Sequence, residues 1–281
     1  MPGDVAFCKG RGMGQPIDVT DSRSSKFSYS ICTFVTNHSQ YNDMVDSFVS
    51  HGFLYDDCEY LYIDNSETNR YDAFAGLNKF LTVATGLYII ICHQDVLLLE
   101  DGRKKLDAVI EELSQLDPNW GVCGNGGGVH PGRLALRVTD PHGDNQYTER
   151  LPMKVSGLDE NFLVARRDAN LAVSRDLRGF HLYGADLCIV ARFLGYTTYV
   201  VDFHIRHLSW GKKGASFDPL RSSMIAKYGR SLRPQMITTP STTIFLGRPT
   251  LLSAFLNHSI VTRIARRLGQ LAARQDSQSK S

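Results

Sequence analysis

The chain has 281 residues, of which 42% are hydrophobic and 21% are charged, proportions that are ordinary for a soluble globular protein. No apolar run reaches the ~20 residues of a membrane-spanning helix, and no basic segment followed by an apolar one opens the chain, so we expect neither a transmembrane nor a secreted protein. Charge is unevenly distributed, because six Lys or Arg and one Asp follow Gly247 and make the C-terminal segment basic. The rest of the chain carries 25 basic and 28 acidic residues, and this slight negative balance argues against nucleic acid as a partner.

The cysteines indicate the cellular compartment. There are six, they are scattered, and none forms a C-x-x-C pair, which disfavours a zinc ribbon or a redox motif. Cys32, Cys92 and Cys123 fall in predicted strands, where a reduced thiol behaves as a small buried apolar group. We therefore expect a cytoplasmic protein.

The first residues lack hydrophobic periodicity. Residues 1–26 are rich in Gly, Ser, Asp and Arg, which is typical of a flexible leader. Gly10, Gly12 and Gly14 follow no predicted strand, so they do not form a phosphate-binding loop.

Strand and helix patterns then alternate up to residue 123. The predicted strands are 29–37, 59–63, 87–92 and 120–123, and the predicted helices are 41–51, 73–84 and 101–116. The run 87–92 (L-Y-I-I-I-C) is apolar throughout, as in a strand buried on both faces. We expect Gly86 to end the helix before it, and residues 124–128 to form a flexible turn. This order predicts an α/β fold with a mostly parallel central sheet flanked by helices.

The second half of the chain is less regular. We expect a strand at 134–138, a turn at 140–144, a return to the sheet at 162–165, a helix at 183–194 and a strand at 197–201. Residues 205–211 then leave the sheet, and the chain from 212 onward is mostly helical and irregular. The predicted organisation is a leader (1–26), one α/β domain (27–211) and a helical C-terminal extension (212–281).

Polar residues follow three of the predicted strands. They are Thr36-Asn37, Asp64-Asn65 and His93-Gln94-Asp95. Because parallel strands place their carboxyl ends at one edge of a sheet, we expect these groups to converge there. Neighbouring carboxylates at such an edge suit Mg²⁺ or Mn²⁺ with a nucleoside diphosphate. The residues alone leave a turn or an Asx cap open for Asp64, and a strand-ending turn or a helix N-cap open for the tripeptide.

This order of strand ends resembles the GT-A glycosyltransferases, specifically the family-2-like branch in which His-Gln-Asp replaces Asp-x-Asp. Further segments that resemble the family follow in order: Asp159–Arg167, Gly179–Cys188 (F-H-x-Y-x-x-D-x-C), Gly195-Tyr196 and Ile205–Gly211 (H-x-S-x-G). The resemblance covers residues 29 to about 211.

The resemblance implies roles at the matching positions. Asp95 corresponds to the metal-binding acid, and His207 to a residue near the diphosphate that can be a second metal ligand. His93 stands in place of the acid that contacts the ribose. The positions expected to bind the nucleotide are Thr36, Asn37, Asp64, Asn65, His93 and Gln94.

Asp186 corresponds to the family's catalytic base. Taken alone, an Asp in the first turn of an apolar helix is equally common as a partner of the helix dipole. His207 can likewise be a hydrogen-bonded histidine at a strand end, and Trp210 can either stack on a sugar or pack. The residues by themselves do not decide between these readings.

We therefore expect a metal-dependent glycosyltransferase that uses Mn²⁺ or Mg²⁺ and moves a sugar, with inversion, from a nucleotide-diphosphate sugar to a glycan or lipid-linked acceptor. Surface polysaccharide or glycolipid synthesis would be its setting. A nucleotidyltransferase is an alternative, although residues 29–41 lack a Gly-rich loop and a Lys. A non-catalytic nucleotide-sugar or glycan-binding module is another, because His93 replaces an acid.

The C-terminal segment has apolar residues at helical spacing. Leu256, Ile260, Ile264 and Leu271 share one stripe, and Arg266 lies off it. Such a helix can lie in a membrane interface with its basic residues on anionic headgroups, which would place the enzyme at the inner face of the membrane. The alternative is a helix packed on the catalytic domain or on a second subunit.

Overall fold

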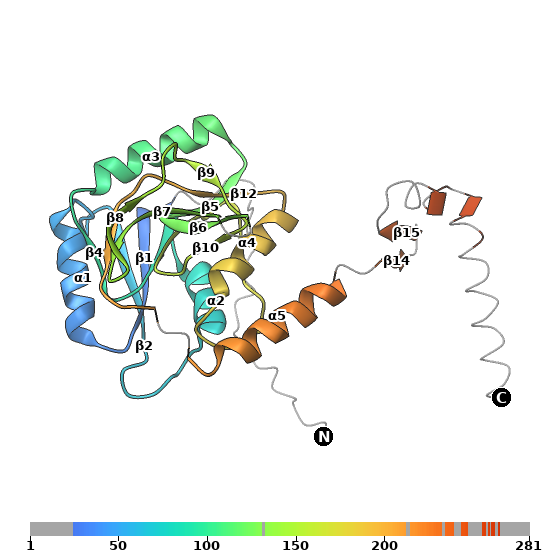
Figure 1. The fold of residues 1–281 in the computed structure, drawn as a ribbon, viewed down its shortest axis with the longest axis horizontal. Helices are drawn as coiled ribbons and strands as arrows, with labels where there is room; N and C mark the ends of the chain where they lie inside the picture. Colours follow the sequence, from blue (N-terminus) through green and yellow to red (C-terminus); the bar gives the residue numbers. More distant parts are fainter. Residues whose placement is uncertain are drawn as a thin grey trace, which may run out of the picture. The chain divides into compact units, whose positions relative to one another are not determined.

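The structure is a computed structural model, shown as a ribbon in Figure 1. It describes residues 25–130, 133–211, 214–231, 234–238 and 243–246, and the isolated positions 255–256, 258, 260–261 and 264. The chain divides into two compact units, one made of Met1–Val173 and Tyr183–Trp210 and the other of Ser174–Leu182 and Gly211–Ser281. The first unit contains every site residue expected from the sequence. Apart from residues 25 and 26, the expected leader lies outside the described residues.

A seven-stranded sheet forms the centre of the first unit, in the order β2-β1-β3-β11-β5-β12-β9. Its strands are β1 (Phe27–Val35), β2 (Cys58–Asp64), β3 (Gly86–Cys92), β5 (Trp120–Gly124), β9 (Met153–Lys154), β11 (Phe162–Arg166) and β12 (Thr197–Val200). β1 runs parallel to β2 and β3, and β5 runs parallel to β12. β11 is antiparallel to both β3 and β5, between which it lies. β9, at the edge of the sheet, is antiparallel to β12. The sheet is therefore mixed: β2, β1 and β3 are parallel, as are β5 and β12, and the antiparallel β11 separates these two groups.

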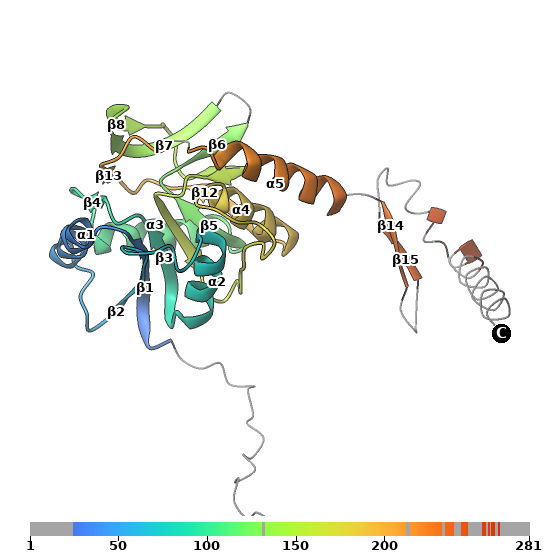
Figure 2. The same cartoon turned by 90° about the horizontal axis from the view of Figure 1, so that it is seen from below.

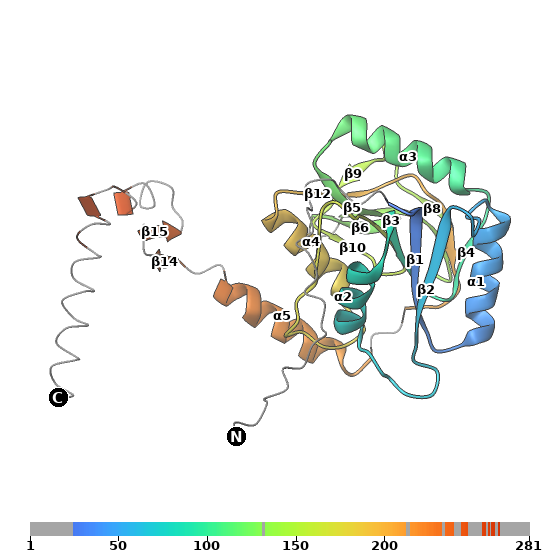
Figure 3. The same cartoon turned by 180° about the vertical axis from the view of Figure 1, so that it is seen from behind.

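Helices cover both faces of this sheet. They are α1 (His38–Ser50), α2 (Ala73–Val83), α3 (Arg103–Leu116) and α4 (Tyr183–Phe193). Met44 of α1 and Leu106 of α3 belong to one buried core with Tyr29 and Ile90. Phe34 points to the other face, where its ring centroid lies 5.2 Å from that of Phe80 in α2. Figures 2 and 3 show α1 and α2 on opposite sides of β1, as the sequence pattern predicts.

After β3 the chain passes from the first sheet into a second sheet. Its order is β10-β6-β7-β13-β4, with β8 paired to β7. Its strands are β4 (Val96–Leu98), β6 (Gly126–His130), β7 (Arg133–Asp140), β8 (Gly143–Tyr147), β10 (Gly157–Leu158) and β13 (Ile205–His207). β13 is antiparallel to β4, with His207 opposite Val96. The three residues 93–95 are therefore the link between the two sheets, and His207 lies beside that link.

Two local predictions about glycines were wrong. Gly86 does not end α2, which stops at Val83; it begins β3, where a Cβ would lie 2.5 Å from the backbone nitrogen of Ser30. The close approach of two strands therefore explains this glycine. Residues 124–128 are not a turn, because Gly126–His130 form β6, which pairs with β7 and β10. At Gly127 a Cβ would lie 2.6 Å from the carbonyl oxygen of Gly157, so strand packing again requires a glycine.

The five cysteines in the described part of the chain are free and buried: Cys32, Cys58, Cys92, Cys123 and Cys188. Burial raises the pKa of the Cys92 thiol to about 12. These thiols therefore behave as apolar core groups rather than as nucleophiles.

Asp117, which follows α3, anchors the start of β12 through a side chain that is 14% exposed. It accepts hydrogen bonds from Thr197 (2.7 Å) and Tyr199 (2.8 Å), and although burial alone would raise its pKa, these bonds lower the pKa to about 2. A carboxyl whose pKa is depressed in the folded state stabilises the fold above about pH 4 and loses that effect as the pH falls through about 2.

We expect Asp117→Asn to lower the free energy of unfolding at pH 7 by roughly 2 kcal/mol. Because the unfolded carboxyl gains a proton near pH 4, the difference from wild type should fall to about half by pH 3. Urea unfolding at a series of pH values measures this difference. A difference that is the same at pH 7 and pH 3 would contradict the assignment.

The second unit contains α5 (Phe217–Ser231) and an antiparallel hairpin of β14 (Gln235–Thr238) and β15 (Thr243–Leu246). The hairpin is a departure from the helical extension expected there. Most of the basic segment expected to form a membrane-surface helix lies outside the described residues. Among the helices that the structure does describe, none has both the length and the apolar character to cross a bilayer.

Candidate functional site

The predicted strand ends do meet at one edge of the first sheet. Val35 at the end of β1 pairs with Asp64 at the end of β2, and the backbone N–H of Asn65 donates to the carbonyl of Val35 (2.7 Å). From the end of β3, Gln94 reaches Thr36 beyond β1. The parallel arrangement of β1, β2 and β3 accounts for this convergence.

His93, Asp95 and His207 form a compact cluster at this edge. The Nε2 atom of His207 lies 3.2 Å from Nδ1 of His93 and 3.4 Å from Oδ1 of Asp95. One ligand atom from each of the three residues can be chosen so that all lie within 4.8 Å of one another. His93 was expected to contact nucleotide, and the structure places it with the two expected metal ligands.

Backbone hydrogen bonds fix this cluster. The N–H of His93 donates to the carbonyl of Asn161 (3.0 Å), just before β11, and the N–H of Leu208 donates to the carbonyl of Asp95 (3.1 Å). The link between the sheets is thus held by residues that directly flank one strand of each sheet, β11 and β13. A rigid backbone of this kind is what a preorganised binding site needs.

The surroundings of Asp95 in this cluster favour the ionised form of its side chain. The side chains of Asp95 and His207 are 12% and 8% exposed. Burial alone would raise the pKa of Asp95, but the hydrogen bond from His207 and the electrostatic interaction with the neighbouring imidazoles of His207 and His93 lower the pKa to about 2. Asp95 is therefore available as an anionic ligand throughout the physiological pH range.

Tyr183, which sequence reasoning gave no role, completes the surroundings of His93. Its hydroxyl lies 3.1 Å from Nε2 of His93 and donates to the carbonyl of Glu160 (3.2 Å). Burial, followed by the negative charge of Glu160, raises the pKa of Tyr183 well above its ordinary value. The Tyr lies in the F-H-x-Y segment, and only its long-range contacts distinguish it from an ordinary core tyrosine.

Gln94 fastens the end of β1 to the cluster. Its Oε1 atom accepts from the backbone N–H groups of Thr36 (2.8 Å) and Asn37 (2.9 Å), and its Nε2 atom donates to Oγ1 of Thr36 (2.8 Å). Asn37 is also the N-cap of α1, accepting from the N–H of Ser39 (3.0 Å). These three residues thus support the edge structurally, and contact of any of them with a nucleotide stays a prediction.

Asp64 and Asn65 lie at the end of β2 with different surroundings. The side chain of Asp64 is 39% exposed and lies 3.5 Å from Nε2 of His38. Its Oδ1 atom accepts from the hydroxyl (2.6 Å) and N–H (2.9 Å) of Ser66, which lower the pKa of Asp64. Asn65 is 4% exposed and holds the following loop through the N–H and carbonyl groups of Tyr71. Asp64 is therefore accessible to a ligand, whereas Asn65 braces the loop beside it.

Asp186 and Trp210 differ strongly in exposure. Asp186, in the first turn of α4, is fully buried, so an acceptor hydroxyl reaches its carboxylate only if neighbouring side chains move. Trp210 is 59% exposed and three residues from His207. Its carbonyl lies 3.1 Å from Nε2 of His142, whose ring meets the indole edge to face.

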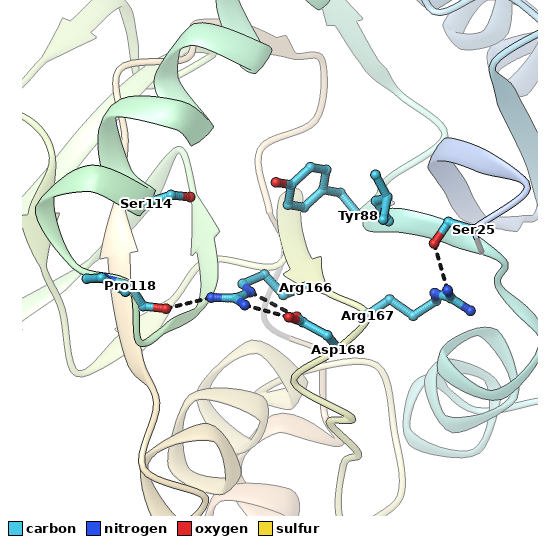
Figure 4. A pocket seen from close by; sticks show the side chains of 8 residues that line it. Ser25, Tyr88, Ser114, Pro118, Arg166, Arg167 and Asp168 are labelled. Atoms are coloured by element: carbon cyan, nitrogen blue, oxygen red, sulfur yellow. Dashed lines mark hydrogen bonds and ion pairs between the residues drawn. The ribbon is translucent and has the colours of Figure 1, made fainter. Parts of the chain in front are cut away.

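A cavity of about 590 Å³ lies at the opposite edge of the sheet (Figure 4). It is lined by residues at the start of β3 and the end of β11, among them Tyr88, Arg166, Arg167 and Asp168. The Arg166 guanidinium already donates hydrogen bonds to Asp168 (2.9 Å) and to the carbonyl of Pro118 (2.7 Å), as the dashed lines in Figure 4 show. We therefore place the candidate site at the strand ends and not in this cavity.

The donor set at the strand ends fits a divalent cation. Two ligand atoms at right angles, each about 2.1 Å from one ion, lie about 3.0 Å apart, close to the 3.2 and 3.4 Å found here. Two imidazoles and one carboxylate leave positions open for other ligands, and imidazole favours transition metals such as Mn²⁺ over Mg²⁺. The residues present thus fit the expected metal.

Comparison with known proteins identifies one relative by sequence. The chain is 37% identical over 223 residues to the product of open reading frame 6 of the ATP synthase subunits region of Fuscovulum blasticum, an alignment that covers 76% of this chain and 89% of that protein. No family model matches the chain. The name of this relative describes a genome position and states no activity.

Solved structures resemble the chain in fold. A mannosyltransferase from Pyrobaculum calidifontis, solved in complex with GDP-Man and Mn²⁺, aligns with a TM-score of 0.51 at 14% identity over 92% of this chain and 79% of that one. GalNAc-T7, solved with UDP, GalNAc and Mn²⁺, gives a TM-score of 0.46 at 10% identity over 66% of this chain and 45% of that chain. The mannosyltransferase likeness confirms the predicted α/β fold of GT-A type.

Proposed function

The chain belongs to the protein family of the Fuscovulum blasticum open reading frame 6 product, and we propose that it is a glycosyltransferase that uses a nucleotide-diphosphate sugar as donor. The convergence of His93, Asp95 and His207 at the carboxyl edge of a GT-A type sheet carries this proposal. The donor class is supported by the mannosyltransferase of similar fold, whose complex contains GDP-Man and Mn²⁺.

In this proposal the three clustered side chains hold a divalent cation, which supplies positive charge for the leaving diphosphate. Asp64, partly exposed at the end of β2, contacts the ribose or the base, and Thr36, Asn37, Asn65 and Gln94 shape the edge on which the nucleotide lies. The acceptor oxygen forms a bond to the anomeric carbon as the bond from that carbon to the phosphate oxygen breaks. Asp186 receives the acceptor proton, and a single displacement of this kind inverts the anomeric configuration.

We propose a glycan or a lipid-linked sugar as acceptor, in surface polysaccharide or glycolipid synthesis. The support for a lipid-linked acceptor is the basic, apolar-striped segment that follows Gly247, which can bring a cytoplasmic enzyme to the inner face of a membrane.

Nucleotide-sugar turnover tests the proposal. The purified chain, supplied with a panel of nucleotide sugars and Mn²⁺, should release nucleoside diphosphate faster than an Asp95→Ala control. A thermal-shift screen identifies the donor first, because a ligand that binds only the folded state raises the melting temperature. Donor binding without release of nucleoside diphosphate, even with acceptor glycans present, would identify a binding module in place of an enzyme.

A further inference from the structure

We propose that Tyr183 is a positioning residue that fixes the tautomer of His93, so that Nδ1 of His93 presents a lone pair to a divalent cation. This inference rests on the proposed function, since it concerns the metal site assigned there. It adds a residue outside the ligand set, and it names the ligand atom that His93 contributes.

The tautomer follows from the hydrogens available at the Tyr183 hydroxyl. A neutral tyrosine hydroxyl has one hydrogen, and here it donates to the carbonyl of Glu160 (3.2 Å), an acceptor that has no proton to give. The contact of 3.1 Å between this hydroxyl and Nε2 of His93 can have either atom as donor. With the hydroxyl hydrogen directed to Glu160, Nε2 is the donor. A neutral imidazole with its proton on Nε2 has a bare Nδ1.

The bare Nδ1 points to the cluster. It lies 3.2 Å from Nε2 of His207, which in turn lies 3.4 Å from Oδ1 of Asp95. The opposite tautomer would place the His93 proton on Nδ1, against the position of the cation, and would remove His93 as a ligand.

The orientation of Tyr183 is itself determined by the fold. Tyr183 is 2% exposed and begins α4, and Glu160 follows β10 and precedes β11 at the same edge of the sheet. His93 is held at that edge by the N–H that it donates to Asn161. Partners that orient metal-ligating histidines in this way typically contribute 10–100-fold to metal affinity.

Mn²⁺ affinity of the full chain, measured by calorimetry without nucleotide, tests the proposal. Tyr183→Phe should raise the Kd for Mn²⁺ by about 10–100-fold. Tyr60→Phe is the matched control, because the Tyr60 hydroxyl also donates to a backbone carbonyl, that of Phe53 (2.7 Å), and takes no part in the cluster. The control should keep the wild-type Kd while its melting temperature falls about as much as that of Tyr183→Phe.

The wild-type protein provides a second test that needs no variant at Tyr183. Long-range ¹⁵N NMR of the metal-free chain, with the His93 signals assigned by their loss in His93→Gln, should show the proton on Nε2. A proton on Nδ1, or an unchanged Kd in Tyr183→Phe, overturns the inference. If wild type itself fails to bind Mn²⁺, the metal site of the proposed function fails instead, so the two failures are distinguishable.

Discussion

Asp95→Asn should abolish metal-dependent binding of the donor and leave the fold intact. The substitution removes the only anionic ligand of the cluster while keeping its shape, and two neutral imidazoles retain a divalent cation poorly. We expect a loss of more than about 100-fold in Mn²⁺ affinity, since even partners outside the ligand set contribute 10–100-fold. Calorimetry of Mn²⁺ and of the nucleotide sugar, each in the presence and absence of the other, measures this loss.

The matched control is Asp168→Asn, which removes a carboxylate of 67% side-chain exposure at the opposite edge of the sheet. It should change neither Mn²⁺ nor donor affinity. If Asp95→Asn, like this control, binds Mn²⁺ and turns over the donor as well as wild type does, the cluster of His93, Asp95 and His207 is not the metal site, and the central proposal fails.

Asp186→Asn should lower turnover by about 10²–10⁴-fold while donor and Mn²⁺ affinities stay near those of wild type. The reason is that a general base acts only in the chemical step, whereas the nucleotide and the cation are held by other residues. Pre-steady-state turnover with a saturating donor separates the chemical step from binding, and circular dichroism confirms that the variant is folded.

Because Asp186 is completely buried, the alternative to a catalytic role is a structural one. Loss of folding in Asp186→Asn would assign this carboxylate to the start of α4 as a structural group. Asp159 and Glu160 precede β11 at the same edge and are more exposed. Normal turnover in Asp186→Asn, together with its loss in Asp159→Asn or Glu160→Gln, would transfer the role of base to one of these two residues.

Local periodicity was sufficient to predict most of the elements. The apolar run of β3, the stripe of α2 and the apolar positions of α3 each match the structure to within one or two residues, because side-chain burial follows the periods of strand and helix. The same patterns did not predict β6, whose glycines have no side chain to alternate. Its place depends on strands that approach from far along the chain.

For the candidate site, too, local patterns predicted one part and contacts between distant residues decided the other. Polar residues directly after buried strands, such as Asp64 and Asp95, are visible in a sequence because burial ends there abruptly, and parallel order predicts that they share an edge. Which of them touch one another is not visible. Gln94, for example, accepts hydrogen bonds from Thr36 and Asn37, more than fifty residues away, and its contact with a nucleotide stays a prediction.

The sequence by itself determined the alternation of strands and helices and the sheet edge at which the proposed site lies, and its resemblance to a family indicated Asp95 and His207 as candidate metal ligands. Only the tertiary structure decided that β11 lies antiparallel between β3 and β5, that His93 joins the cluster, and that Tyr183 contacts His93. The reason is physical: periodicity records which face of an element is buried, whereas the pairing of distant strands decides which side chains meet. The contact between His93 and Tyr183 joins residues 90 positions apart, a separation that no local pattern contains.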